Sequence, residues 1–207
     1  MRREPGFTLI ELLVVMGIIV VLVGLLIPGI RIARRSAKKT QATSVILTLE
    51  AALSSYNSDF GDYPPSTLRD VGITTNRIND GNESLVACLS TGRMAGPYYD
   101  FEDEFLVNRD NDKLRNFNRS VFKTGMAFEF LDPWGNPYIY FHNRDYDRPD
   151  VASRYRFAIK KNVRAKPSKS KKKGTYHGLT SYQLWSAGPD GENDNGKDDD
   201  IGSWQGH

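Results

Sequence analysis

The sequence predicts an α+β fold in which a long N-terminal helix, half membrane-spanning and half amphipathic, packs on a small three-stranded antiparallel sheet with an acidic loop near the C-terminus. Three observations predict this fold. Residues 7–30 form a nearly unbroken apolar run, a helical stripe of apolar residues continues beyond it, and the last third holds three short strand patterns between turn residues. The 207 residues suit an anchor followed by one domain of ordinary size.

The composition argues against several classes of function. The net charge of +3 is too small to indicate nucleic-acid binding, and the charge lies in patches: basic at residues 31–39 and 164–173, acidic at 190–200. The lone cysteine, Cys88, excludes an intramolecular disulfide and a cysteine-based metal site, and we expect it to be a buried apolar residue. The three histidines are scattered, so we expect no histidine-based catalytic site and no enzyme.

The apolar run is long enough to cross a membrane. It holds 24 residues with a single ionisable side chain, Glu11, and about 20 residues span the hydrocarbon of a bilayer. A cleaved secretory signal would have a shorter apolar region followed by a small-residue cleavage site. A buried core helix would not be apolar on nearly every face. A transmembrane helix is therefore favoured over both alternatives.

Glu11 is the unusual residue of this run. A charge deep in a bilayer costs at least a few kcal/mol, so such residues usually have a partner. Glu11 lies only five residues into the run, however, and from there its carboxylate can reach the lipid headgroups. The position alone leaves both interpretations open.

The helical pattern continues past the membrane and ends at turn residues. Apolar residues recur at steps of three and four, and we expect them to form the core face of the domain: Ala42, Ile46, Leu49, Leu53 and Tyr56. Gly61 and the pair Pro64 and Pro65 end the pattern, which gives a helix of about 50 residues, roughly 75 Å long. Pro28 is expected to kink or locally break this helix.

The middle of the chain carries little pattern. Residues 61–131 are rich in Gly, Asn and Asp, and only residues 85–89 suggest a helical turn or two. We expect this segment to be an inserted, variable region that decorates the body.

The last part, residues 132–207, holds the sheet. A turn at residues 132–138 carries two prolines, and its Trp134 is expected to be a core residue without a chemical role. The three expected strands lie at residues 139–141, 155–159 and 182–186.

A basic segment precedes the third expected strand. Residues 166–173 hold five lysines. They can form a solvated, mobile loop, or a contact for anionic lipid or an acidic partner.

An acidic loop follows the third expected strand. Residues 190–200 hold six carboxylates in eleven positions, and like charges this dense repel one another. A hard divalent cation would neutralise them through oxygen ligands, while a solvated loop would leave them in water. The loop is not an EF-hand, because Asn195 and Ile201 stand where Gly and Glu would be required. Spacing alone leaves both interpretations open.

The N-terminus carries a family signature. Residues 6–11 read Gly-Phe-Thr-Leu-Ile-Glu before Leu-Leu-Val-Val, which resembles the processing signature of type IV pilins and type II secretion pseudopilins. The resemblance implies that a dedicated prepilin peptidase cuts between Gly6 and Phe7 and methylates the new N-terminus. It also implies that Glu11 pairs with the terminal amine of a neighbouring subunit during assembly. Residues 1–6 would then be the leader, 7–30 the transmembrane half of the helix and 31–60 its amphipathic half.

Other segments resemble the major pseudopilin of type II secretion more closely. Residues 59–64 resemble its helix-exit turn, residues 132–138 read Asp-Pro-Trp-Gly-Asn-Pro-Tyr as in that family, and the acidic loop has a similar ending. The resemblance implies that the loop binds calcium. The implied side-chain ligands are Asp190, Asp198 and Asp200, with carbonyl ligands near Ala187 and Gly196. Asp199 replaces an alanine of the family and is expected to point outward.

The resemblance implies a structural role in the bacterial inner membrane. The chain would cross it once, with its body in the periplasm, and polymerise into a pseudopilus that drives protein export. The implied partners are copies of itself in a helical filament, minor pseudopilins, the inner-membrane assembly platform, the prepilin peptidase and, before assembly, the lipid bilayer; no nucleic acid is implied. The basic residues after the span outnumber Arg2 and Arg3 before it, which opposes this orientation by the positive-inside rule. The family signature is more specific than a charge count, so we follow it.

Two other functions compete. A type IV pilin forming a surface fibre shares the N-terminal signature, but many such pilins close a C-terminal loop with a disulfide, which a single cysteine cannot form. A membrane-tethered enzyme with a metal in the acidic loop is disfavoured. Catalytic metal sites generally combine groups such as histidine with an open coordination position, and this loop offers mainly carboxylates.

Overall fold

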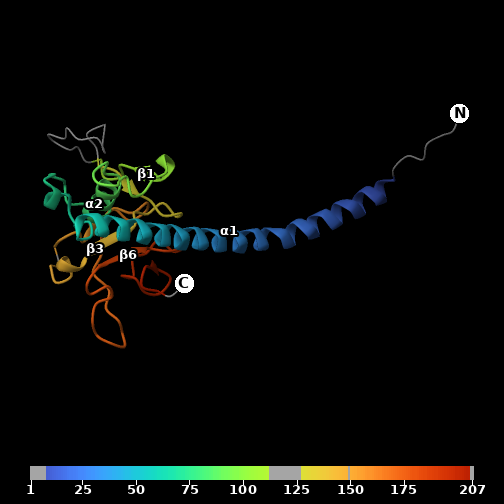
Figure 1. Ribbon diagram of the computed structural model, residues 1–207. Coiled ribbons are helices and arrows are strands. Elements are labelled where there is room, and N and C mark those ends of the chain that lie inside the picture. Colours follow the sequence, from blue (N-terminus) through green and yellow to red (C-terminus); the bar gives the residue numbers. More distant parts are fainter. Residues whose placement is uncertain (1–7, 112–126, 149, 206–207) are drawn as a thin grey trace. The chain divides into compact units, whose positions relative to one another are not determined.

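The computed structural model describes residues 8–111, 127–148 and 150–205 (Figure 1). The chain divides into two units, Met1–Lys38 and Lys39–His207, and one helix, α1, runs from the first into the second. The elements in chain order are α1 (Leu9–Phe60), η1 (Leu68–Val71), α2 (Asp80–Leu89), η2 (Asp103–Phe105), β1 (Leu106–Val107), β2 (Glu129–Phe130), β3 (Ile139–His142), η3 (Asn143–Asp145), β4 (Arg154–Tyr155), β5 (Val163–Arg164), β6 (Tyr182–Ser186) and β7 (Ile201–Gly202).

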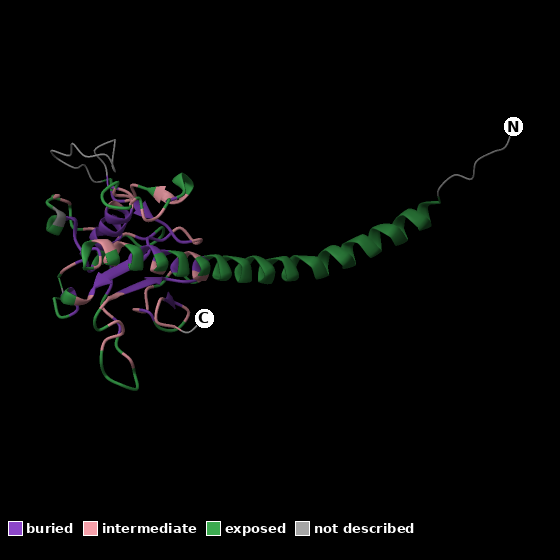
Figure 2. Ribbon diagram, in the orientation of Figure 1, coloured by how far each residue is buried: buried purple, intermediate pink, exposed green. Residues whose placement is uncertain are grey.

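The first unit consists of the apolar part of α1. Its side chains are exposed on every side, as Figure 2 shows, and the helix is long and apolar enough to cross a bilayer. Pro28 was expected to kink or locally break the helix; the helix continues through Pro28, so the break does not occur. The predicted cleavage site between Gly6 and Phe7 lies outside the described residues.

The second unit is built on the amphipathic part of α1. The predicted stripe is confirmed: Ala42, Ile46, Leu49 and Leu53 are fully buried, and Tyr56 packs against their cluster. The same core contains Tyr140 of β3, Leu184 of β6 and Ile201 of β7, so the helix covers the sheet.

The helix ends where the sequence predicts. Gly61 adopts a left-handed conformation (φ 74°), and its N–H donates to the carbonyl of Asn57 at 2.8 Å. A glycine in this conformation satisfies a carbonyl of the last helical turn without steric cost, and it turns the chain out of the helix.

The central sheet has three antiparallel strands in the order β3-β6-β7. The sheet is confirmed, but its membership differs from the prediction. Expected strand 155–159 is not part of it: the chain turns after Tyr155, where the N–H of Phe157 bonds to the carbonyl of Lys160 (2.8 Å), and β4 pairs with β5 in a separate ladder. The third strand is β7, which is only two residues long and follows the acidic loop.

The segment expected to decorate the body contributes to its centre. Helix α2 extends the predicted helical turn at 85–89, and its Leu85, Val86 and Leu89 lie in the same core as α1 and the sheet. Cys88, also on α2, is buried and unpaired as predicted, and burial raises the pKa of its thiol to about 11. Residues 80–89 are therefore a structural layer of the domain.

A buried amide joins α2 to the strands. The side chain of Asn82 accepts from the N–H of Phe130 (2.7 Å) and donates to the carbonyls of Phe130 (3.0 Å) and Tyr138 (2.7 Å). These backbone groups lie in the core, so no water can replace the amide.

Asn82→Ala is therefore expected to lower the free energy of unfolding by about 3 kcal/mol, because it leaves buried backbone groups unpaired. Urea denaturation of a body lacking the span (residues 31–207) measures the change. Asn162→Ala, at an exposed position just before β5, is the matched control. Equal losses for the two variants would contradict this account of Asn82.

The turn at residues 132–138 is held by hydrogen bonds to the buried side chain of Asp132. Asp132 accepts from the N–H groups of Trp134 and Asn136, both at 2.9 Å, and from the hydroxyl of Ser186 on β6 at 2.6 Å. Trp134 is half-buried and packs against the core, so it is a core residue only in part.

Candidate functional sites

The first candidate site is the start of α1. The carboxylate of Glu11 accepts from the N–H (2.8 Å) and the hydroxyl (2.7 Å) of Thr8, and the hydroxyl of Thr8 accepts from the N–H of Glu11 (3.3 Å). This is a reciprocal capping box, which satisfies donors that a helix start leaves unpaired. Glu11 thus has a partner within its own chain, a third possibility that the sequence analysis missed although Thr-x-x-Glu before an apolar run is its usual signal.

The second candidate site is the acidic loop between β6 and β7. The backbone at Gly188 packs closely against the backbone at Asp199 on the other side of the loop. A Cβ on Gly188 (φ 67°) would lie 2.3 Å from the carbonyl oxygen of Asp199, so only glycine fits there. The indole N–H of Trp185 on β6 donates to Asn193 at 3.0 Å, which fastens the loop to the sheet. The loop is therefore an ordered part of the domain.

Three carboxylates converge on this loop. Oxygen atoms of Asp190, Asp194 and Asp199 lie within 4.8 Å of one another, a group that can hold a metal ion. Burial, reinforced by the charges of Asp198 and Asp190, raises the pKa of Asp194 above its usual value. The crowding disfavours the ionised loop unless a cation is present.

Asp200 is buried next to this group. Its Oδ2 accepts from the N–H groups of Asp194 (3.0 Å) and Gly196 (2.7 Å), whereas its Oδ1 is buried without a hydrogen-bond partner in the described part of the chain. Burial raises the pKa of this carboxyl to about 7. A buried carboxylate oxygen without a partner beside three further carboxylates fits a hard cation, which prefers oxygen ligands.

The predicted and observed sets of residues overlap only in part. Asp190 belongs to the converging group and Asp200 lies next to it, but Asp198 is exposed at a turn closed by the N–H of Asp200 and the carbonyl of Lys197 (2.9 Å). Asp199, expected to point outward, joins the group, and so does Asp194, which the sequence analysis missed. Ala187 at the start of the loop and Gly196 within it are both buried. The exact ligands remain a prediction.

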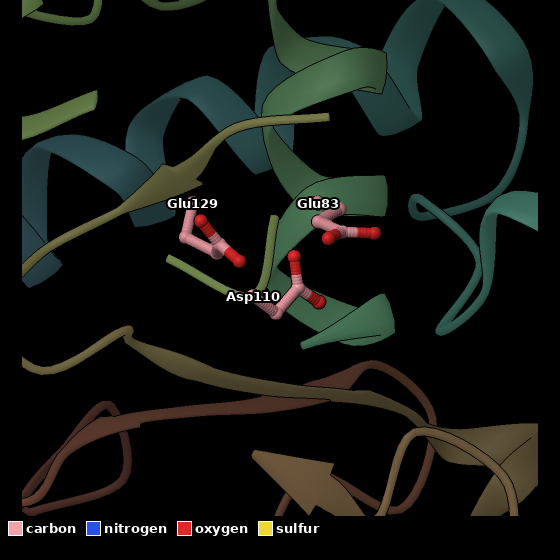
Figure 3. A group of neighbouring side chains, drawn as sticks. All are labelled: Glu83, Asp110 and Glu129. Atoms are coloured by element: carbon pink, nitrogen blue, oxygen red, sulfur yellow. The ribbon is translucent and has the colours of Figure 1, made fainter. Parts of the chain in front are cut away.

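A third group of carboxylates lies inside the body. Figure 3 shows Glu83 of α2, Asp110 and Glu129 of β2 directed toward one another; all three are buried, and their oxygens lie within 4.8 Å. Glu129 accepts from the N–H of Arg109 (2.7 Å) and the amide of Asn79 (2.6 Å). Burial raises the pKa of Glu129 to about 7, so near neutral pH this carboxyl is partly protonated.

The pH dependence of stability follows from this shift. The pKa of Glu129 in the folded state lies above the ordinary value of 4.5, so folding favours the protonated side chain. The stabilisation that protonated Glu129 gives the folded state is therefore fully present below pH 4.5 and is lost as the pH rises through 7. We expect Glu129→Gln to flatten the decline of unfolding free energy between pH 4.5 and 8 by about 1–3 kcal/mol. Urea denaturation across this range measures it, with the exposed Glu102→Gln as control. Identical pH profiles for wild type and Glu129→Gln would rule the shift out.

Comparisons with known proteins agree with the N-terminal signature. The family described as "Prokaryotic N-terminal methylation motif" matches residues 1–27. The type II secretion system core protein G of Escherichia coli is 29% identical over 98% of this chain and 92% of its own length, and that of Pseudomonas aeruginosa is 27% identical over 98% and 96%. The type IV wide pilus major component of Thermus thermophilus is 40% identical over 66% of this chain and 100% of its own length. No solved structure matches significantly.

An exposed apolar helix with an N-terminal methylation motif, continued into an α+β body, defines a pilin-like protein. The chain belongs to the type IV pilin-like family. Over nearly its full length it is also similar to the core protein G of type II secretion systems.

Proposed function

We propose that this chain is the structural subunit of a periplasmic pseudopilus that polymerises to drive protein export by a type II secretion system. The observation that carries the proposal is the exposed apolar helix, whose start holds a carboxylate and whose far end builds the core of a folded body. An apolar helix that the described part of its own chain leaves exposed needs either lipid or other copies of itself. The near full-length similarity to core protein G supports secretion as the purpose.

In this proposal the helix is first stored in the bacterial inner membrane, with the body in the periplasm. The prepilin peptidase removes residues 1–6 and methylates Phe7. Residues 7–30 then leave the bilayer and pack in the filament core, while residues 31–60 join that core to the body. The basic residues after the span would face lipid phosphates or acidic groups of neighbouring subunits. The work is done by polymerisation, so no catalytic residue is needed.

Calcium is the cation we propose for the acidic loop. The donors are carboxylate and carbonyl oxygens, which suit calcium rather than zinc. Asp190, with Asp200 and its neighbours, would hold the ion, and carbonyls near Ala187 and Gly196 would complete the shell. Bound calcium would stiffen the loop that joins β6 to β7. It would take no part in a reaction.

The proposal is tested in cells that produce the full chain. Mass spectrometry should find the mature protein starting at an N-methylated Phe7, and loss of the chain should abolish export of a secreted cargo. Minor pseudopilins and the assembly platform should co-purify with it after crosslinking. Normal export without the chain would contradict the proposal.

The competing proposal is a type IV pilin that forms a surface fibre. It is favoured by the 40% identity to the wide-pilus component over the whole of that protein. Electron microscopy of wild-type cells distinguishes the two, because a pilin gives long surface fibres and a pseudopilin does not. Neighbouring genes for a secretin and an export ATPase favour secretion, and a retraction ATPase favours a pilus.

A further inference from the structure

A hairpin rich in lysine projects from the body between β5 and β6. We call residues 166–176 the lysine hairpin; its exposed lysines are Lys166, Lys169, Lys171, Lys172 and Lys173. Two backbone hydrogen bonds close the turn. The N–H of Ser170 donates to the carbonyl of Thr175 (2.9 Å), and the N–H of Gly174 donates to the carbonyl of Ser170 (2.8 Å). The ammonium of Lys169 lies 4.3 Å from the centre of the Tyr176 ring.

The base of the hairpin is fixed by a buried amide. Gln183, fully buried on β6, accepts from the N–H of Ser168 (2.6 Å) and donates to the carbonyls of Ser168 (2.9 Å) and His177 (2.8 Å). Both strands of the hairpin are thereby held against the sheet. The base of the segment is therefore anchored to the sheet.

The positive charges of the hairpin form no ion pair in the described part of the chain. None of its five lysines has a carboxylate oxygen within 4.0 Å, whereas Lys160 reaches Glu192 of the acidic loop at 2.6 Å. Lysines held this close repel one another, and an ordered surface of one sign attracts a partner of the opposite sign.

The acidic loop of the same chain has the complementary charge. Its middle lies next to the base of the hairpin: the N–H of Lys166 donates to Asn195 (2.6 Å), and the amide of Asn193 donates to the carbonyl of Arg164 (3.0 Å). The body thus carries a basic and an acidic patch side by side. The six carboxylates of the loop exceed the charge of one divalent cation, so the loop stays negative when a metal is bound.

We propose that the lysine hairpin of one subunit contacts the acidic loop of a second copy of this chain. The inference rests on the proposed polymerisation. In a helical homopolymer each contact joins one patch of a subunit to a different patch of its neighbour. A body with one basic and one acidic patch fits this arrangement. The contact sets the rotation between neighbouring bodies and weakens as salt screens it.

Cysteine crosslinking in assembled filaments of the full chain tests the contact. Lys172→Cys combined with Glu192→Cys should give a ladder of disulfide-linked oligomers on oxidation. Glu192 lies outside both sets of candidate metal ligands, so the variant spares the cation site. Lys172→Cys with Glu104→Cys, an exposed acid elsewhere on the body, is the matched control and should stay monomeric. Equal ladders from the two pairs, or none from the first, would overturn the inference.

Charge reversal gives the second arm. Lys171→Glu, Lys172→Glu and Lys173→Glu together should lower the filament yield about tenfold, because acidic groups would then face acidic groups. The control reverses three exposed arginines elsewhere: Arg69→Glu, Arg77→Glu and Arg154→Glu. Equal loss in the control would mean that net charge alone matters and would overturn the inference.

The two arms separate this inference from the proposed function. Filaments that form normally in the lysine variant would overturn the contact and leave the pseudopilus intact. Absence of filaments in the wild type would overturn both. If the wild-type chain binds anionic vesicles and Lys172→Cys forms no crosslink to Glu192→Cys, the hairpin binds lipid. This result would also overturn the contact between subunits.

Discussion

Glu11→Ala is expected to leave the chain in the membrane but to lower the filament yield more than about 100-fold. The substitution makes the span more apolar, so insertion is not impaired. It removes a carboxylate that we propose to pair with the terminal amine of a neighbouring subunit, and loss of one partner from a buried ion pair costs about 3–5 kcal/mol. Membrane fractionation and the amount of sheared filament measure the two effects. Normal assembly of Glu11→Ala would show that this role of Glu11 is wrong.

The capping box gives Glu11 a second role, and two variants distinguish the roles. Glu11→Gln keeps a side chain that can complete the box with Thr8 but removes the charge. Thr8→Ala keeps the charge and removes the cap. If pairing with the amine governs assembly, Glu11→Gln should fail as Glu11→Ala does and Thr8→Ala should assemble. The reverse pattern would assign the effect of Glu11 to the helix start.

Features that repeat along the chain could be predicted from the sequence. The stripe from Ala42 to Tyr56 follows the helical period, and the stop at Gly61 follows from glycine chemistry, so both agree with the structure. Strand β7 could not be found in this way, because two residues carry no alternation. The apolar alternation after Tyr155 suggested a strand, but a turn at Phe157 takes the chain out of the ladder.

For the candidate sites too, residues that are contiguous in the sequence could be predicted, and residues that only folding brings together could not. The acidic loop is contiguous, so its charge was evident from the sequence, but the choice between Asp198 and Asp194 depends on a turn at Lys197. The group of Glu83, Asp110 and Glu129 joins three separate segments, and no local pattern marks it. The capping box of Thr8 was local and readable, yet the membrane span and the family signature drew the interpretation of Glu11 elsewhere.

Removal of calcium is expected to destabilise the body by loosening the acidic loop. An ion present at about 100 times its dissociation constant stabilises the folded state by about 2.7 kcal/mol, which corresponds to roughly 5–10 °C in Tm for a domain of this size. Calorimetry of residues 31–207 with calcium, with magnesium and with a chelator measures the change. No shift in Tm and no heat of binding at millimolar calcium would exclude the calcium site.

The ligand set can then be decided with conservative variants. Asp200→Asn should abolish the calcium-dependent shift, because the buried Oδ1 of Asp200 is the oxygen that lacks a partner in the described part of the chain. Asp198→Asn should abolish it only if the set implied by the family holds, and Asp194→Asn only if the converging group is the site. Glu192→Gln, outside both sets, should keep the shift. If Asp200→Asn leaves the calcium-dependent shift in Tm unchanged, the ion does not bind at Asp200, and the unpaired Oδ1 has no role in binding it.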